Sequence, residues 1–311
     1  MQKASLLDRV RARAPAYWPL MREEPLWAVM FAFSRINAAR RLERLISDAD
    51  YKRPQEVKET VLPGLDLPAI VSTLIEDGVY RGLQLPDAIV EEIREFAETH
   101  PCFTKAAPTE GFLPRDYAQA NAARDRDILA AFYFQTAEQC PAVMKLREDS
   151  TFSSIASAYL GQPAVLMRTR LWWSFPATRI SDVDLHLAAQ NRFHFDIDGW
   201  RTLKFFFYLT PTGEGAGPHQ YIRASHRRRK LKHQFTPTTG RPTPQLQDFY
   251  KPEEFITITG QPGFGFVEDP FVFHTGTLCR DTPRLMLEIG FGVSAANPAY
   301  KNPDFIYGRL G

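Results

Sequence analysis

The sequence contains few cysteines, and none of them are close together. Its three, Cys102, Cys140 and Cys279, are far apart and odd in number. This spacing gives no disulfide framework and no CxxC metal site, and unpaired thiols fit a reducing compartment. We therefore expect a cytoplasmic protein without structural disulfides.

The sequence also lacks an excess of charge and a long apolar run. Its 38 basic residues are nearly balanced by 36 acidic ones, whereas nucleic-acid-binding proteins usually carry a strong positive field. The best apolar run, Pro25–Phe33, is about half of the roughly 20 residues that span a bilayer. Charged residues follow Met1–Ser5 closely, so no secretory signal is expected. We expect neither a nucleic-acid partner nor a transmembrane segment.

Residues 1–60 read as a helical extension in front of a larger domain at 61–311. Apolar residues recur at spacings of three and four, and four arginines lie among them: Arg35, Arg40, Arg41 and Arg44. A basic amphipathic helix can lie on an anionic membrane surface. Packing of its apolar stripe on the rest of the protein is the commoner use of such a helix, and we favour it.

The rest of the chain changes from helical to strand-like patterns at Ala164. Before it we expect helices at Pro86–His100, near 128–139 and at 150–160, with a long loop over 101–127. After it, short apolar runs alternate with Gly and Pro turns: Val165–Phe175, Thr202–Leu209, Pro218–Arg223, Phe255–Thr259, Gly265–Val267 and Arg284–Val293. Short strands at such spacing are typical of a β-sandwich or barrel, so we expect a mostly β protein with flanking helices.

A histidine and an aspartate stand two residues apart just before the apolar run 202–209. Residues two apart in a strand point to the same side, so His194 and Asp196 would share one space. Such a pair also arises by chance, and a hydrogen-bonded surface pair is the alternative. Asp198 lies on the same face, as an acid supporting the pair or exposed at the surface.

A second histidine and an arginine complete a chemical pattern near the end of the chain. His274 follows an apolar run, and Arg284 comes ten residues later. Two histidines and one carboxylate on a β-scaffold form the facial triad of non-haem Fe(II) oxygenases. Arg284 could clamp a carboxylate with two parallel hydrogen bonds, or it could pair with an internal acid such as Glu288.

These residues together resemble the phytanoyl-CoA dioxygenase (PhyH-like) family of Fe(II)/2-oxoglutarate-dependent oxygenases. The likeness is carried by "FHFDIDGWRTLKFFFYLTPTGEGAGPHQYIRASHR", then His274 and Arg284, and spans roughly 75–293. The family usually has glycine where Ala224 stands, which affects a turn and not the metal. The resemblance implies a double-stranded β-helix (jelly-roll, cupin-like) core. It also implies hydroxylation that uses Fe(II), O₂ and 2-oxoglutarate as co-substrate.

The resemblance assigns roles to single residues. His194, Asp196 and His274 would be the metal ligands, and Arg284 would bind 2-oxoglutarate. Related halogenases have Gly or Ala in place of Asp196, so oxygen transfer is favoured over halogenation here. Trp200 would line the substrate cavity, as a similar aromatic does in ectoine hydroxylases, or stand at its rim.

Other basic residues allow two interpretations each. Arg168 and Arg170 alternate with apolar residues on a strand, so they face either the cavity and the substrate or the solvent. The basic run 227–232 could attract an anionic substrate, but a solvated loop is the commoner case. His219 and His226 are expected to be hydrogen-bonded structural residues.

Two other functions compete with the oxygenase. One is a catalytically silent barrel that only binds a ligand. The other is a cupin-type metalloenzyme that does not use 2-oxoglutarate, in which Arg284 would have no role. The expected substrate is a small organic or lipid-like molecule, anionic or of CoA type, and its identity is open.

Overall fold

The computed structural model describes residues 22, 25–47, 60–104, 107–134, 139–180, 191–236 and 240–293. The strands in this part of the chain are β1 (Val79–Gln84), β2 (Cys102–Thr104), β3 (Ala107–Phe112), β4 (Ala130–Tyr133), β5 (Val165–Ser174), β6 (Thr202–Tyr208), β7 (His219–Ile222), β8 (Phe255–Ile258), β9 (Phe264–Glu268), β10 (His274–Gly276) and β11 (Arg284–Gly292). The helices are α2 (Pro25–Phe33), α3 (Asn37–Ser47), α4 (Leu67–Asp77), α5 (Asp87–Thr99), α6 (Tyr117–Ala122), α8 (Pro141–Glu148), α9 (Ser150–Leu160), α11 (Leu231–Gln234) and α12 (Pro244–Gln247), with 3-10 turns η1 (Pro114–Asp116) and η2 (Pro252–Glu254).

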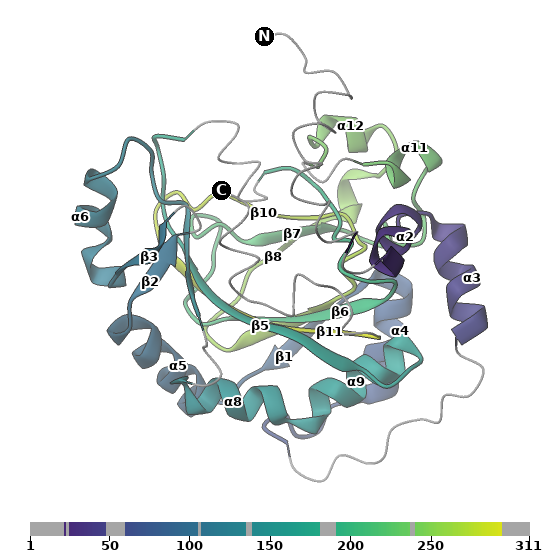
Figure 1. The fold of residues 1–311 in the computed structure, drawn as a ribbon, viewed down its shortest axis with the longest axis horizontal. Helices are drawn as coiled ribbons and strands as arrows, with labels where there is room; N and C mark the ends of the chain where they lie inside the picture. Colours follow the sequence, from purple (N-terminus) through teal and green to yellow (C-terminus); the bar gives the residue numbers. More distant parts are fainter. Residues whose placement is uncertain are drawn as a thin grey trace.

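Two antiparallel sheets form the centre of the molecule (Figure 1). The larger has the order β1-β9-β6-β11-β5-β4-β2-β3 and the smaller the order β10-β7-β8. An isolated antiparallel bridge between His194 and His274 attaches the segment before β6 to the smaller sheet. This mostly antiparallel architecture with several helices confirms the predicted jelly-roll-like α+β fold.

The strands of the larger sheet divide their side chains between two layers. Leu203, Phe205 and Phe207 of β6 belong to the main hydrophobic core, and the residues between them face the space enclosed by the two sheets. β5 and β11 alternate in the same way, because successive side chains of a strand point to opposite faces. Four helices, α4, α5, α8 and α9, lie beneath the larger sheet (Figure 1) and cover its apolar face.

Helix α4 shows how local sequence sets an element's ends. The Asp66 side chain accepts a hydrogen bond from the backbone N–H of Ala69 at 2.9 Å and caps the helix. Gly78 ends it with φ of 84°, a left-handed conformation that suits glycine. A Cβ at Gly78 would lie 2.3 Å from Val272 Cγ1, so the close packing of the Val272 side chain also requires glycine.

The predicted strands after Ala164 are confirmed as β5 to β9 and β11, and the helices predicted at 86–100 and 150–160 as α5 and α9. Two predictions before it were wrong. The predicted loop 101–127 contains β2, β3, η1 and α6. Where a helix was predicted near 128–139, the described residues 128–134 contain strand β4 and no helix. β3 is the edge strand, the position that tolerates Pro108. β4 pairs with the long strand β5, a partner that local periodicity cannot reveal.

The described part of the extension consists of α2 and α3, and it packs differently from the prediction. Trp27 and Met30 are buried, whereas Leu42, Leu45 and Ile46 of α3 are exposed. The arginines of α3 contact the domain instead, with Arg44 Nη2 donating to the Tyr159 carbonyl at 2.9 Å. Residues 1–21, 23–24 and 48–59 of the extension lie outside the described ranges, and the boundary at residue 60 stays a prediction.

Across the described residues, no helix combines the length and apolar character that crossing a bilayer requires. The three cysteines are buried, and none of them forms a disulfide.

Candidate metal centre

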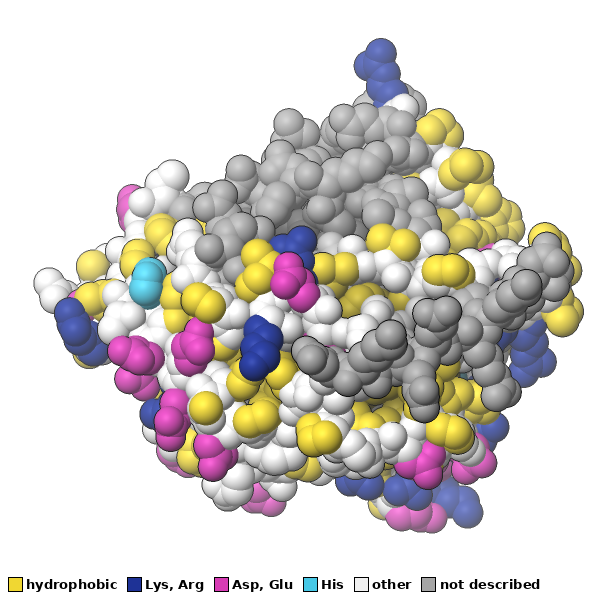
Figure 2. All heavy atoms as spheres, turned by 90° about the horizontal axis from the view of Figure 1, so that it is seen from below, with side chains coloured by type: hydrophobic (Ala, Val, Ile, Leu, Met, Phe, Trp, Pro, Cys, Tyr) yellow, Lys and Arg dark blue, Asp and Glu magenta, His cyan; other side chains and the backbone are white. Residues whose placement is uncertain are grey.

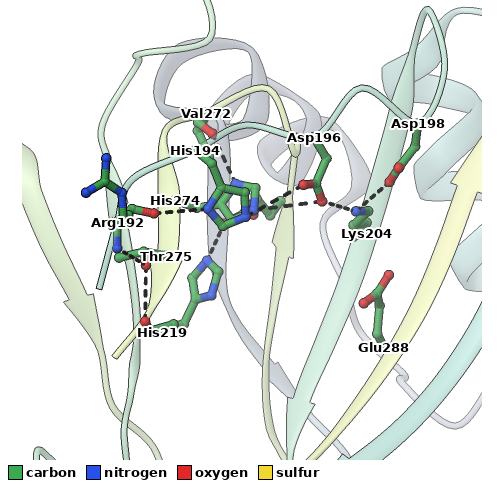
Figure 3. Close-up of polar contacts among 12 residues, drawn as sticks. Arg192, His194, Asp196, Asp198, Lys204, His219, Val272, His274, Thr275 and Glu288 are labelled. Carbon is green, nitrogen blue, oxygen red and sulfur yellow. Dashed lines mark hydrogen bonds and ion pairs between the residues drawn. The ribbon is translucent and has the colours of Figure 1, made fainter. Parts of the chain in front are cut away.

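His194, Asp196 and His274 come together between the two sheets. One ligand atom from each lies within 4.8 Å of the other two, and Figure 3 shows the three side chains pointing toward one another. Each histidine donates its backbone N–H to the other's carbonyl, at 3.0 and 2.8 Å, which places the rings side by side. The strand-like spacing of His194 and Asp196 then brings the carboxylate to the same point.

The hydrogen bonds of both imidazoles leave the nitrogens nearest to Asp196 available. The Nδ1 atoms of His194 and His274 each lie 3.1 Å from a backbone carbonyl, of Arg192 and Val272. A carbonyl only accepts, so each Nδ1 donates, and in the neutral form of each ring the lone pair is on Nε2. These Nε2 atoms lie 3.7 and 3.8 Å from the Asp196 carboxylate oxygens.

This donor set fits a divalent metal ion. Ligands about 2.1 Å from a common ion lie roughly 3 Å apart when adjacent, so the two His–Asp separations of 3.7 and 3.8 Å would each need to shorten by less than about 1 Å. Burial would raise the pKa of Asp196, but the Lys204 ammonium and the two histidines hold it well below its usual range. Burial lowers the pKa of His274 to about 4. Both residues are therefore in the protonation states that bind metals at neutral pH.

Lys204 is the cation beside the metal site, and the sequence interpretation missed it. Its ammonium group contacts Asp196 Oδ2 and lies 2.7 Å from Asp198 Oδ2, so it bridges the two acids (Figure 3). Its side chain is only 4% exposed. The available signal was a lysine inside the apolar stretch 203–209, where an unpaired charge would be costly.

Replacing Lys204 by methionine should destabilise the metal-free protein. Asp196 and Asp198 would lose their shared cation, and removing one partner of a buried ion pair costs on the order of 3 kcal/mol. A divalent ion would supply the missing charge, so Co(II) should raise the melting temperature of Lys204→Met more than that of the wild type. Differential scanning calorimetry checks both effects. Lys145→Met, an exposed change on α8, is the control; equal stability of Lys204→Met and wild type would contradict the bridging role.

A buried acid, Glu268, contacts His274 on the side of the ring away from Asp196 and also contacts His219. Glu268 of β9 lies 2.7 Å from His219 Nε2 and 3.3 Å from His274 Nδ1. Burial raises the pKa of Glu268 to about 7 and lowers that of His219 to about 3. His219 is thus a hydrogen-bonded residue at the cavity wall, and its structural role was predicted. Glu268 was not predicted, because only the pairing of β9 with β6 places it there.

Arg168 and Arg170 face the interior, which decides between the two interpretations of the sequence. Both pair with Glu288 of β11, Arg168 through Nε at 2.5 Å and Arg170 through Nη2. The guanidinium of Arg170 also lies over the ring of Trp172, 4.6 Å from its centroid. Glu288 is fully buried. The alternative in which Arg284 takes Glu288 as its partner is therefore wrong.

The ion pairs of Glu288 with Arg168 and Arg170 make the free energy of unfolding depend on pH. Burial would raise the pKa of Glu288, but Arg168 and Arg170 lower it from 4.5 to about 2. A depressed pKa stabilises the fold above the unfolded value, and this contribution is lost as pH falls from 4.5 to about 2. Glu288→Gln should thus lose on the order of 3 kcal/mol at pH 7, a deficit that shrinks toward pH 2. Urea unfolding across this range tests it, with exposed Glu91→Gln as control; a pH-independent deficit would contradict the mechanism.

Arg284 lies at the wall of the cavity that His194, Asp196 and His274 also line. It is 4% exposed, donates through Nη1 to the Gly217 carbonyl, and has Nη2 3.2 Å from Ser174 Oγ. Its Nε is buried and has no hydrogen-bond partner among the described residues. A buried guanidinium with donor capacity left over fits an anionic ligand, as predicted for 2-oxoglutarate.

The cavity that joins these residues has a volume of about 660 Å³. The metal triad, Arg284 and Arg170 all line it, together with aromatic and apolar side chains: Phe132, Trp172, Phe206 and Met286. Volumes of 300–1,000 Å³ or so are usual for small-molecule sites.

Trp200 and the basic run do not contribute to this cavity wall. Trp200 packs against Trp27 and Met30 of α2, because the extension covers that position; the cavity-lining prediction is therefore wrong for the structure as described. In the run 227–232, only Arg229 is a buried cation, lying 3.8 Å from the centroid of the Phe195 ring. The other basic residues of the run are exposed, as a solvated loop predicts.

Comparison with known proteins finds similarity at the level of structure only. No protein-family model matches the sequence, and no curated protein matches it. The non-heme alpha ketoglutarate dependent epimerase SnoN from nogalamycin biosynthesis is similar with a TM-score of 0.47 and 12% identity over 73% of this chain and 82% of that one. HygX from Streptomyces hygroscopicus, solved with nickel, 2-oxoglutarate and hygromycin B, gives a TM-score of 0.48 and 12% identity over 72% and 86%.

AviO1 from Streptomyces viridochromogenes Tue57 is similar with a TM-score of 0.47 and 14% identity over 78% of this chain and 99% of that one. At identities this low and TM-scores below 0.5, these similarities say nothing about the reaction.

Proposed function

We propose that this chain is a mononuclear non-haem Fe(II)- and 2-oxoglutarate-dependent oxygenase of the phytanoyl-CoA dioxygenase type. It would hydroxylate an unactivated C–H bond of a small organic or lipid/CoA-type substrate. The observation that supports this most is the meeting of His194, Asp196 and His274 in one cavity that Arg284 also lines. Membership in that family rests on the spacing of these motif residues.

The three proposed ligands would hold the iron and leave adjacent positions open for co-substrate and O₂. Fe(II), when bound with 2-oxoglutarate and O₂, supplies C–H oxidation with release of succinate and CO₂. The chain's own contribution is positional. Backbone carbonyls of Arg192 and Val272 orient the imidazoles, and Lys204 donates to Oδ2 of Asp196, so Oδ1 would remain available to hold the metal.

The proposed substrate class follows from the cavity wall. Phe132, Trp172, Phe206 and Met286 offer apolar contact to a hydrocarbon part, away from water. Arg170 is the basic residue proposed to meet an anionic group of the substrate. Arg284 would bind the distal carboxylate of 2-oxoglutarate through a bidentate pair.

One measurement separates this function from its two rivals. The purified protein, supplied with Fe(II) and 2-oxoglutarate in air, should release succinate even without its own substrate, because such enzymes oxidise the co-substrate slowly when uncoupled. A silent binding module would release none. A cupin-type metalloenzyme would bind the metal but show no 2-oxoglutarate-dependent product. Absence of succinate from a metal-loaded sample would contradict the proposal.

A further inference from the structure

Exposed apolar side chains are concentrated on one side of the molecule. Among the described residues, eleven large hydrophobic side chains are exposed, and all except Ile75 and Val165 belong to α2, α3 or the segment 231–249. These nine are Leu26, Val29, Phe33, Leu42, Leu45, Ile46, Leu231, Phe235 and Phe249. Figure 1 shows α2, α3, α11 and α12 together at the right-hand side, and Figure 2 shows hydrophobic side chains gathered at that end. Exposed apolar side chains that gather on one side of a protein are a common mark of an interaction site.

Helix α3 presents its apolar face outward. Arg40 Nε donates to the Trp200 carbonyl at 3.2 Å, and the Asn37 backbone N–H donates to Gln234 Oε1 at 3.0 Å. The polar face of α3 therefore packs on the domain. Leu42, Leu45 and Ile46 on the other face are 58, 79 and 71% exposed. A helix packed only for stability has the opposite orientation, so this apolar face is available to a partner.

The same side of the molecule is strongly basic. Residues 25–47 and 227–251 contain eleven basic residues and only two acidic ones, Glu43 and Asp248, in a chain whose net charge is +2. Glu43 already pairs with Arg201 at 3.1 Å. The side chains of Arg41 and Arg227 are exposed and form no ion pair or hydrogen bond with any described residue. The partner is therefore expected to be anionic.

A pocket beside α3 can take an anion the size of a phosphate group. It has a volume of about 210 Å³ and is lined by five arginines: Arg40, Arg41, Arg44, Arg201 and Arg227. Asp269 is the single carboxylate in its lining. Guanidinium groups bind phosphate oxygens through paired hydrogen bonds.

From these observations we infer that α2, α3 and the segment 227–251 form a docking face for an anionic lipid bilayer. The exposed apolar side chains enter the boundary between headgroups and acyl chains, and the arginines lie at the level of the lipid phosphates. A second copy of the chain fits less well, because a symmetric contact would bring two strongly basic faces together. The inference does not depend on the proposed oxygenase chemistry.

Co-sedimentation with lipid vesicles tests the charge requirement. The full chain should bind vesicles that contain about a third phosphatidylserine, bind phosphatidylcholine vesicles weakly, and dissociate from the former as salt rises. Each basic residue near an anionic surface contributes about fivefold to binding. Arg41→Glu with Arg227→Glu should therefore lower the partition coefficient more than about 25-fold. Arg115→Glu changes an exposed arginine directly before α6, the helix at the left-hand side of Figure 1, and as the matched control it should lower the partition coefficient little.

A second set of variants tests the apolar requirement. Serine at Leu42, Leu45 and Ile46 should lower vesicle binding more than about tenfold, whereas methionine at the same three positions keeps the apolar surface and should retain it. Equal binding of wild type to both vesicle types, or to neither, would overturn the inference. So would light scattering that shows a wild-type dimer converted to a monomer by the serine changes, since the face would then join two copies. Thermal unfolding verifies that every variant is folded.

Discussion

Replacing Asp196 by alanine should abolish substrate hydroxylation and succinate release. The change removes the charged member of the His194, Asp196 and His274 cluster. Even loss of a residue that only supports a metal ligand lowers affinity about 10- to 100-fold, so loss of the carboxylate itself should weaken Fe(II) binding by more than about 100-fold. It also leaves Lys204 without one of its two acids. Anaerobic titration with Fe(II) or Co(II), followed by succinate determination, checks both results.

Asp198→Ala is the matched control for this experiment. Asp198 lies two residues further on and contacts the same lysine at 2.7 Å, but it does not belong to the cluster of potential ligands. Its loss should change stability while metal affinity stays within about tenfold of wild type. Full turnover by Asp196→Ala, or an equal loss of metal affinity in both variants, would rule out the proposed ligand set.

Replacing Arg284 by alanine should weaken 2-oxoglutarate binding by about 30- to 5,000-fold. The buried carboxylate of the co-substrate would lose its charged partner, and such a truncation costs about 2–5 kcal/mol. Fe(II) affinity should remain, because Arg284 is not among the residues that can hold the ion. Anaerobic addition of 2-oxoglutarate to the Fe(II) protein, followed by the metal-to-ligand charge-transfer band, measures the affinity.

Two variants make the result specific. Arg284→Lys keeps the charge but not the paired hydrogen bonds, so it should fall between wild type and alanine. Arg170→Ala removes a cation that lies in the same cavity but is paired with Glu288. An Arg284→Ala variant with wild-type affinity would show that the anchor lies elsewhere, and Arg168 or Arg170 would become the candidate.

The triad and the strands after Ala164 could be predicted because their signals are local. Residues two apart in an extended chain point to the same side, so the spacing of His194 and Asp196 already predicts that they share one space. Alternating apolar residues predict the strands. The approach of His274 to His194 required the resemblance as well, since eighty residues separate them.

The unpredicted features depend on contacts distant in sequence. β4 is a strand because β5 offers it an edge. Lys204 and Glu268 lie opposite each other in paired strands, which no local pattern states. The orientation of α3 is the clearest case: its amphipathic pattern was visible, but the side that packs is decided by carbonyls of Trp200 and Tyr159 in the domain.

The alternation of side chains along the central strands affects which substitutions this protein can accept. In β5, β6 and β11, even-numbered positions such as Arg170, Lys204 and Met286 face the cavity. Odd-numbered positions such as Leu171 and Phe205 belong to the core between the larger sheet and the helices. Substitution at even positions can alter charge and shape of the chamber while leaving the helix-covered core intact. The scaffold thus places the residues that shape the ligand chamber and those that fill the apolar core at alternate positions of the same strands, and the ion-paired Lys204 and Glu288 join the chamber to the stability of the fold.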